Sequence, residues 1–131
     1  WVGDRAQVHR AVAVVDCGQI IHPDCAAQQI EGGIIMGLSS ALDEEITLRD
    51  GAVVERSFGD YRIMTLAQTP EIDVHFVRSD AAPGGLGEVG VPPAAPALAN
   101  ALFQATGLRA RQTPLNKTLR VLMDERAAGG S

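Results

Sequence analysis

The stretch GLGEVG, residues 85–90, decides which fold and which function the rest of the chain can support. Its glycine spacing matches G-x-G-x-x-G, the pattern of a dinucleotide-binding turn. A strand-like run, EIDVHFV at 71–77, precedes it, and a helix-forming run, PALANALFQA at 96–105, follows it. Two interpretations compete: a loop that binds a nucleotide pyrophosphate, or a different site around Glu88.

Three features argue against the nucleotide interpretation. In a nucleotide turn the first glycine follows the strand at once, whereas SDAAPG at 79–84 intervenes here. The prolines of VPPAAP at 91–96 delay the start of the helix, and no acidic residue follows until Asp124 to hold a ribose. A phosphate-binding P-loop is excluded as well, because no Lys-Ser/Thr pair follows the glycines.

The alternative centres on the carboxylate of Glu88. It lies between Gly87 and Gly90, just before a helix, where a bulky partner could reach it and where backbone N–H groups are accessible. Such a carboxylate is a candidate general base. A solvated glutamate in a mobile loop remains the alternative from these residues alone.

Size and composition narrow the function further. The chain has 131 residues, which predicts a single domain over 1–131, with 46% apolar and 4% aromatic residues. A net charge of −5 without a Lys/Arg cluster argues against nucleic acid as a partner. No apolar run approaches the roughly 20 residues of a membrane span.

Cys17, Cys25 and the dispersed histidines offer no metal-ligand spacing, so we expect no metal site built from this chain. The cysteines are expected to be buried free thiols, with a disulfide as the alternative.

Hydrophobic periodicity predicts an α+β fold, with two main helices on one face of a mostly antiparallel or mixed sheet. Asp24 is expected to supply the acceptor at the start of the first helix. The expected elements are strands over 7–17 and 71–77, a hairpin over 45–57 that turns at Asp50 and Gly51, helices over 24–43, from 92 or 93 to 107, and over 116–124, and a frayed tail at 126–131.

The first helix contains Glu31, Gly32 and Gly33 in its middle. Each interior glycine costs roughly 1 kcal/mol relative to alanine, so two together need a reason. Close approach of a ligand and packing against another backbone both remain open.

Two long motifs in order then point to a family. They are VVDCGQIIHPDCAAQQIEGGIIMGLSSALDEE at 14–45 and GGLGEVGVPPAAPALANALFQATG at 84–107. Together they resemble the C-terminal end of the molybdenum-cofactor subunit of the xanthine dehydrogenase/aldehyde oxidase family. The similarity is greatest to the large (beta) subunits of isoquinoline 1-oxidoreductase-like enzymes and related aldehyde dehydrogenases. The resemblance implies a molybdenum cofactor-binding fold and an oxidoreductase.

The resemblance also implies residue roles. Gln29 would hydrogen-bond the molybdopterin cofactor, with Gly33 on the same helix face at i, i+4. Gly85 and Gly87 would belong to the cofactor loop. Glu88 would be the catalytic base that takes a proton from the hydroxide or water ligand of molybdenum. The activated oxygen would attack a carbon of an N-heterocycle or aldehyde, and hydride would pass to the sulfido ligand.

The implied assembly is larger than this chain. Family subunits have several hundred residues, so the resemblance makes this chain a C-terminal fragment that is inactive without the remainder of the large subunit. The implied cofactor is molybdenum–molybdopterin, as the cytosine dinucleotide form, with 2Fe-2S clusters on a small partner subunit.

The other function considered is a non-catalytic relic or assembly module that binds no cofactor, and the presence of Gln29 and Glu88 argues against it. His22, where the family has Asn, and Val89, where many relatives have Pro, are departures outside the implied catalytic position. Substrate, compartment, electron acceptor and oligomeric state are left open.

Overall fold

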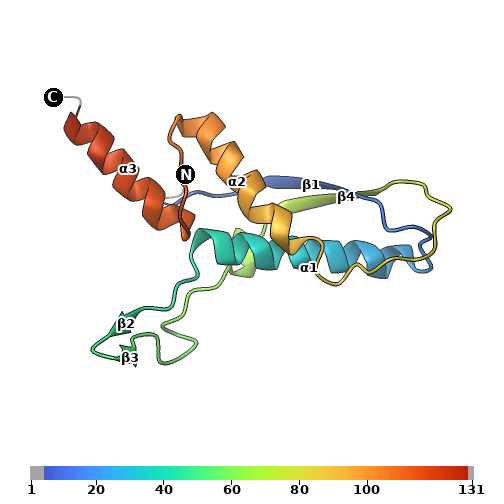
Figure 1. Ribbon diagram of the computed structural model, residues 1–131, viewed down its shortest axis with the longest axis horizontal. Helices are drawn as coiled ribbons and strands as arrows, with labels where there is room; N and C mark the ends of the chain where they lie inside the picture. The colour runs from blue at the N-terminus through green and yellow to red at the C-terminus, as the bar shows by residue number, and fades with distance from the viewer. Residues whose placement is uncertain (1–4, 130–131) are drawn as a thin grey trace.

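The computed structural model describes residues 5–129 and places two long helices against a small parallel sheet (Figure 1). The sheet pairs β1 (Arg10–Val15) with β4 (Glu71–Phe76). Helix α1 (Pro23–Leu42) packs on the sheet, α2 (Val91–Thr106) packs on α1, and α3 (Leu115–Gly129) forms the C-terminal end of the described chain. The predicted α+β class is confirmed.

The main strand ladder is parallel. Arg10 lies opposite Glu71, and Val15 lies opposite Phe76. After β1 the chain crosses over through α1 before it enters β4, so the two strands run in the same direction. The inner face contributes apolar side chains to the helix-packed core: Ala11, Ala13, Val15, Ile72, Val74 and Phe76.

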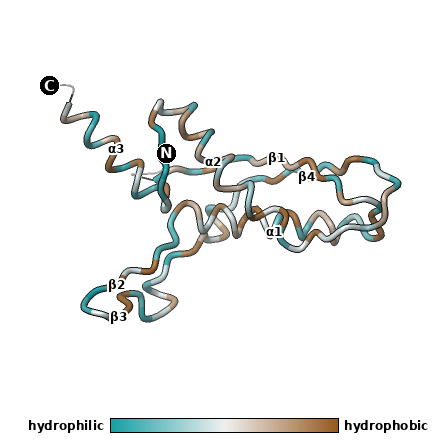
Figure 2. The backbone as a smooth tube through the Cα atoms, viewed as in Figure 1, coloured by the Kyte–Doolittle hydropathy of each residue, from teal (hydrophilic) through white to brown (hydrophobic). Residues whose placement is uncertain are grey.

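The antiparallel pairing is confined to a short hairpin of β2 (Leu48–Arg49) and β3 (Ala52–Val53). Its turn lies at Asp50 and Gly51, as predicted, and both residues have positive φ. The hairpin and the segment leading to the short 3₁₀ helix η1 (Leu66–Gln68) form an arm that projects from the body, with apolar stretches along it (Figure 2). The arm is tied to the end of α1, because Ser39 Oγ accepts the N–H of Met64 at 2.9 Å.

Helix α1 presents an apolar stripe at four-residue spacing, and its members Ile30, Ile34, Leu38 and Leu42 are all buried. Its start differs from the prediction. The Nδ1 atom of His22, and not Asp24, accepts the backbone N–H of Cys25 at 3.2 Å. His22 therefore occupies the capping position that short polar side chains usually fill.

Two further expectations need correction. Helix α3 continues to Gly129, so residues 126–129 are helical where the sequence predicted a frayed tail; residues 130 and 131 lie outside the described residues. Cys17 and Cys25 are both free thiols, but only Cys17 is buried. Cys25 lies in the first turn of α1 and is exposed. Within residues 5–129, no helix is long and apolar enough to cross a membrane.

Candidate cofactor site

The glycine-rich loop is anchored at its N-terminal side by the turn that ends β1. The N–H of Gly84 donates to the carbonyl of Cys17 at 2.8 Å, and the N–H of Gln19 donates to the carbonyl of Ala81 at 3.0 Å. Gly18 has φ +70°, and a Cβ built there would lie 2.2 Å from the carbonyl oxygen of Ala82. Only glycine fits this crossing, for conformational and steric reasons.

The loop is anchored at its other side by α1. A Cβ on Gly90 would lie 2.9 Å from the carbonyl oxygen of Ile30, and one on Gly33 would lie 3.2 Å from the Cα of Gly90. The two glycines thus allow the backbone of the loop to touch the helix. Packing against the loop therefore explains why Gly33 is a glycine although glycine is unfavourable inside a helix. It does not explain Gly32, where a Cβ would meet nothing within 4 Å.

Between these anchors the loop is open. Cβ atoms on Gly85 and Gly87 would meet nothing within 4 Å. Glu88 is exposed; its carbonyl accepts the N–H of Val91 at 3.0 Å, and its carboxylate has no partner within residues 5–129. The backbone N–H groups of residues 85–88 likewise donate to nothing in the described part of the chain. The loop therefore offers free donors and one free carboxylate.

Gln29 lies on α1 one residue before Ile30, whose carbonyl contacts Gly90. Its side chain is exposed, and no hydrogen bond links it to Glu88 or to any other residue between 5 and 129. The structure therefore brings the two sequence motifs together through the backbone contact of Gly33 with Gly90. Gln29, Gly85, Gly87 and Glu88 remain accessible around that contact.

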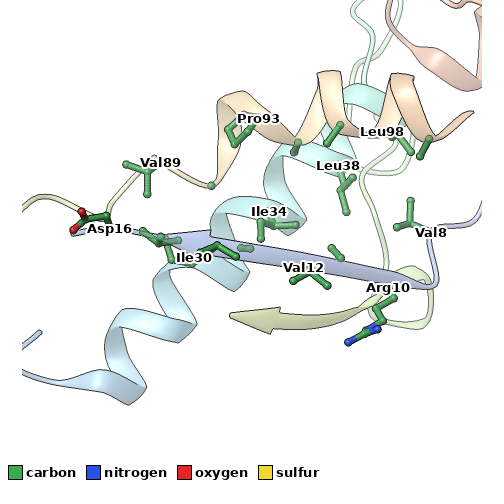
Figure 3. A pocket seen from close by; sticks show the side chains of 18 of the residues that line it. Val8, Arg10, Val12, Asp16, Ile30, Ile34, Leu38, Val89, Pro93 and Leu98 are labelled. Carbon is green, nitrogen blue, oxygen red and sulfur yellow. The ribbon is translucent and has the colours of Figure 1, made fainter. Parts of the chain in front are cut away.

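A cavity of about 610 Å³ lies between β1, α1 and α2 and reaches the loop at one end (Figure 3). Gly85 is the predicted site residue that lines it. Asp16 and Val89 lie at that end, and Arg10 lies at the other. The Arg10 guanidinium donates to Asp73 at 2.6 Å, and this hydrogen bond raises the pKa of Arg10. The other side chains that line the cavity are apolar, so burial of an anion there would be energetically unfavourable.

No cluster of three or more His, Cys, Asp or Glu side chains within residues 5–129 could hold a metal ion.

Comparison with known proteins decides the family. A family model described as "Molybdopterin cofactor-binding domain" matches residues 4–70. The chain belongs to this family. The domain is 40% identical to the membrane-bound aldehyde dehydrogenase [pyrroloquinoline-quinone] of Gluconacetobacter polyoxogenes, over 88% of this chain and 16% of the relative. It is 38% identical to isoquinoline 1-oxidoreductase subunit beta of Brevundimonas diminuta, over 86% of this chain and 14% of the relative.

The fold has been solved in a larger protein. The domain superposes on a chain of a Cu,Mo-CO dehydrogenase with a TM-score of 0.79 at 23% identity, covering 96% of this chain and 17% of that one. The domain thus spans about one sixth of the length of such proteins.

The residues of the domain fit a molybdopterin chemically. A pterin ring presents N–H donors and N and O acceptors. The amide of Gln29 has a carbonyl oxygen that can accept from the former and an NH₂ group that can donate to the latter. The free N–H groups of residues 85–88 suit the negatively charged phosphate of such a cofactor. The loop at 84–90 contains no Lys or Arg, so neutral donors would have this role.

The sequence analysis did not predict that Gly18, Gly37 and Gly90 are needed for close backbone packing. A Cβ on Gly37 would lie 2.7 Å from the Cβ of Ala94 and from the carbonyl oxygen of Val91. The four-residue spacing of Gly33 and Gly37 was the available signal, because small residues at i, i+4 allow helices to approach closely.

Proposed function

We propose that this domain is the C-terminal, cofactor-contacting part of the large subunit of a molybdenum hydroxylase, and that Glu88 is its catalytic base. The observation that carries the proposal is the exposed, unpartnered carboxylate of Glu88 in a loop fixed at both ends. Both anchors depend on glycines, so the position of the carboxylate is set by backbone contacts. The membership in the molybdopterin cofactor-binding family supports the choice of chemistry.

The other residues have supporting roles in this proposal. Gln29 holds the pterin through its amide, and the open backbone at Gly85 and Gly87 admits the cofactor and offers N–H donors. Gly33 acts indirectly, by seating the loop on α1. When bound, the molybdenum cofactor, in its cytosine dinucleotide form, supplies two-electron oxidation with oxygen derived from water. Glu88 accepts a proton on its carboxylate and holds the reacting water in place.

The substrate class we propose is an N-heterocycle or an aldehyde. It is supported by relatives whose names refer to isoquinoline and to aldehyde oxidation. One of those names refers to pyrroloquinoline quinone, while the family description supports molybdopterin. The remainder of the large subunit and a small subunit with 2Fe-2S clusters complete the enzyme, and the domain alone is inactive because a base without the metal has no proton to take.

The test is Glu88→Gln in the full-length large subunit, purified with its small subunit. We expect turnover of heterocycles or aldehydes to fall by about 10²–10⁴-fold, the usual contribution of a positioned base. Molybdenum and pterin contents should stay near one each per large subunit, because the amide is isosteric with the carboxylate. Steady-state kinetics and metal and pterin analysis on the same samples give both readouts.

Glu125→Gln is the matched control, since Glu125 is an exposed glutamate on α3. It should leave turnover unchanged. Unchanged turnover in Glu88→Gln would remove Glu88 from catalysis. Wild-type protein without metal and pterin, from a host that loads such enzymes, would instead favour the non-catalytic assembly module.

A further inference from the structure

Strand β1 has one edge that no described residue pairs. Its other edge is hydrogen-bonded to β4. The N–H of Glu71 donates to the carbonyl of His9 at 3.1 Å, and the N–H of Val77 donates to the carbonyl of Val15 at 2.9 Å. Backbone groups in a parallel ladder alternate in direction along the strand. The odd-numbered residues of β1 therefore bond to β4, and Arg10, Val12 and Val14 direct their N–H and C=O groups to the opposite, free edge.

The apolar cavity runs along this strand (Figure 3). Its other walls come from apolar side chains of α1 and α2: Ile30, Ile34, Leu38, Ala94 and Leu98. Val12 and Val14 stand beside it and are 56% and 69% exposed. An unpaired strand edge next to an apolar groove fits an extended segment with alternating apolar side chains, added as a further strand.

The edge lacks the features that protect exposed strands in native proteins. Such edges usually carry lysines, prolines or bulges, whereas the outward positions in the middle of β1 are valines. Arg10 is engaged with Asp73 across the sheet. A parallel sheet of only two strands is also unusual, because parallel strands are normally buried within larger sheets. Both observations favour an edge that is covered in the intact protein.

We propose that an extended segment from the remainder of the large subunit adds to the free edge of β1 as a third strand and fills the groove between β1, α1 and α2. The inference rests on the proposed function for the existence of that remainder. It is supported by the relatives, in which this domain accounts for only 16% and 14% of the length. A single extended segment can enter between the helices, whereas a folded second copy would bring its own α1 and α2 against these walls.

Residue-resolved amide hydrogen exchange on the full-length large subunit tests the proposal. The amides of Ala11 and Ala13, which face β4, are the internal reference. We expect Val12 and Val14 to exchange within about tenfold of that reference, since paired amides open only with the sheet. Exchange of Val12 and Val14 about a hundredfold or more faster than the reference would overturn the proposal. Protection that depends on protein concentration, with dimers in sedimentation, would assign the edge to a second copy and overturn it as well.

A variant pair gives a second readout. Ala97→Asp, at an exposed alanine of α2 that lines the groove, places a charge in the groove and should abolish the protection of Val14 and lower the yield of soluble subunit. Val121→Asp is the control, because Val121 is 51% exposed on α3, away from the groove, and should behave as wild type. Wild-type protection of Val14 in Ala97→Asp would contradict a strand seated in the groove.

Molybdenum and pterin analysis on the same preparations separates this inference from the proposed function. Protected Val12 and Val14 amides in a subunit that binds no cofactor would leave the third strand standing and refute the hydroxylase. A fully loaded enzyme with unprotected amides would refute the third strand alone.

Discussion

At the scale of single residues, the site combines positions fixed by backbone contacts with side chains that have no partner. His22 shows how a departure from the family pattern can preserve structure. Its Nδ1 accepts the N–H of Cys25, a role that short polar side chains such as Asn commonly have at a helix start. This substitution therefore leaves the start of α1, and with it the position of Gln29, in place.

Gln28 and Gln29 give a test of the cofactor role at this scale. Both are exposed on adjacent positions of α1, so they have the same chemistry and face different directions. We expect Gln29→Ala to lower the pterin and molybdenum content of the purified full-length enzyme by about tenfold, as one lost hydrogen bond of about 1.4 kcal/mol predicts. Gln28→Ala should leave the content unchanged. Equal contents in the two variants would exclude Gln29 from cofactor binding.

At the scale of elements, α1 and α2 meet through small residues. Gly33 receives the backbone of Gly90, and one turn later Gly37 receives Val91 and Ala94 at the start of α2. This close approach brings Gly90 onto α1 and so fixes the C-terminal end of the loop that carries Glu88. The geometry of the site is therefore a consequence of helix packing.

Two glycine substitutions on α1 should have opposite signs. Gly37→Ala should destabilise the chain by about 1–3 kcal/mol, because its Cβ would lie 2.7 Å from backbone and side-chain atoms that cannot move independently. Gly32→Ala should stabilise it by about 0.5–1 kcal/mol through helix propensity, because its Cβ meets nothing within 4 Å. Denaturant unfolding gives both values. Loss of stability in both variants would contradict the open environment at Gly32.

At the scale of the whole molecule, the segments far apart in the chain are joined near the end of α1. Asn116 donates to Asp43 at 3.0 Å and accepts the N–H of Ala6 at 2.9 Å, and Arg5 forms an ion pair with the same Asp43. Beside this junction Leu119 of α3 is 0% exposed in the core. Helix α3 thus closes the core at the end of α1 and α2 that is remote from the site.

Leu119→Ala tests whether α3 is part of one cooperative core. We expect a loss of about 2–5 kcal/mol, the usual cost of removing a buried leucine side chain, seen as a lower urea midpoint in a single transition. Val121→Ala, at an exposed position on the same helix, should change stability by at most about 0.5 kcal/mol. A separate early transition for α3 would show that this helix folds independently of the sheet.

The sequence by itself determined the elements and the family. Periodicity located α1, α2 and both long strands to within a few residues, because local hydrophobic patterns reflect the face that each element buries. The two motifs identified the molybdopterin cofactor-binding family, and Glu88 and Gln29 remain its predicted functional residues. These properties depend on residues close in the chain or on residue identity.

Only the tertiary structure decided how the motifs meet. The parallel pairing of β1 with β4, the contact of Gly33 with Gly90 and the crossing of Gly18 with Ala82 join segments that are far apart in sequence. No local pattern distinguishes a glycine that admits a ligand from one that admits another backbone, because both need only the absence of a Cβ. The arrangement in space decides between them, since it depends on which distant backbone the packed core brings to that position.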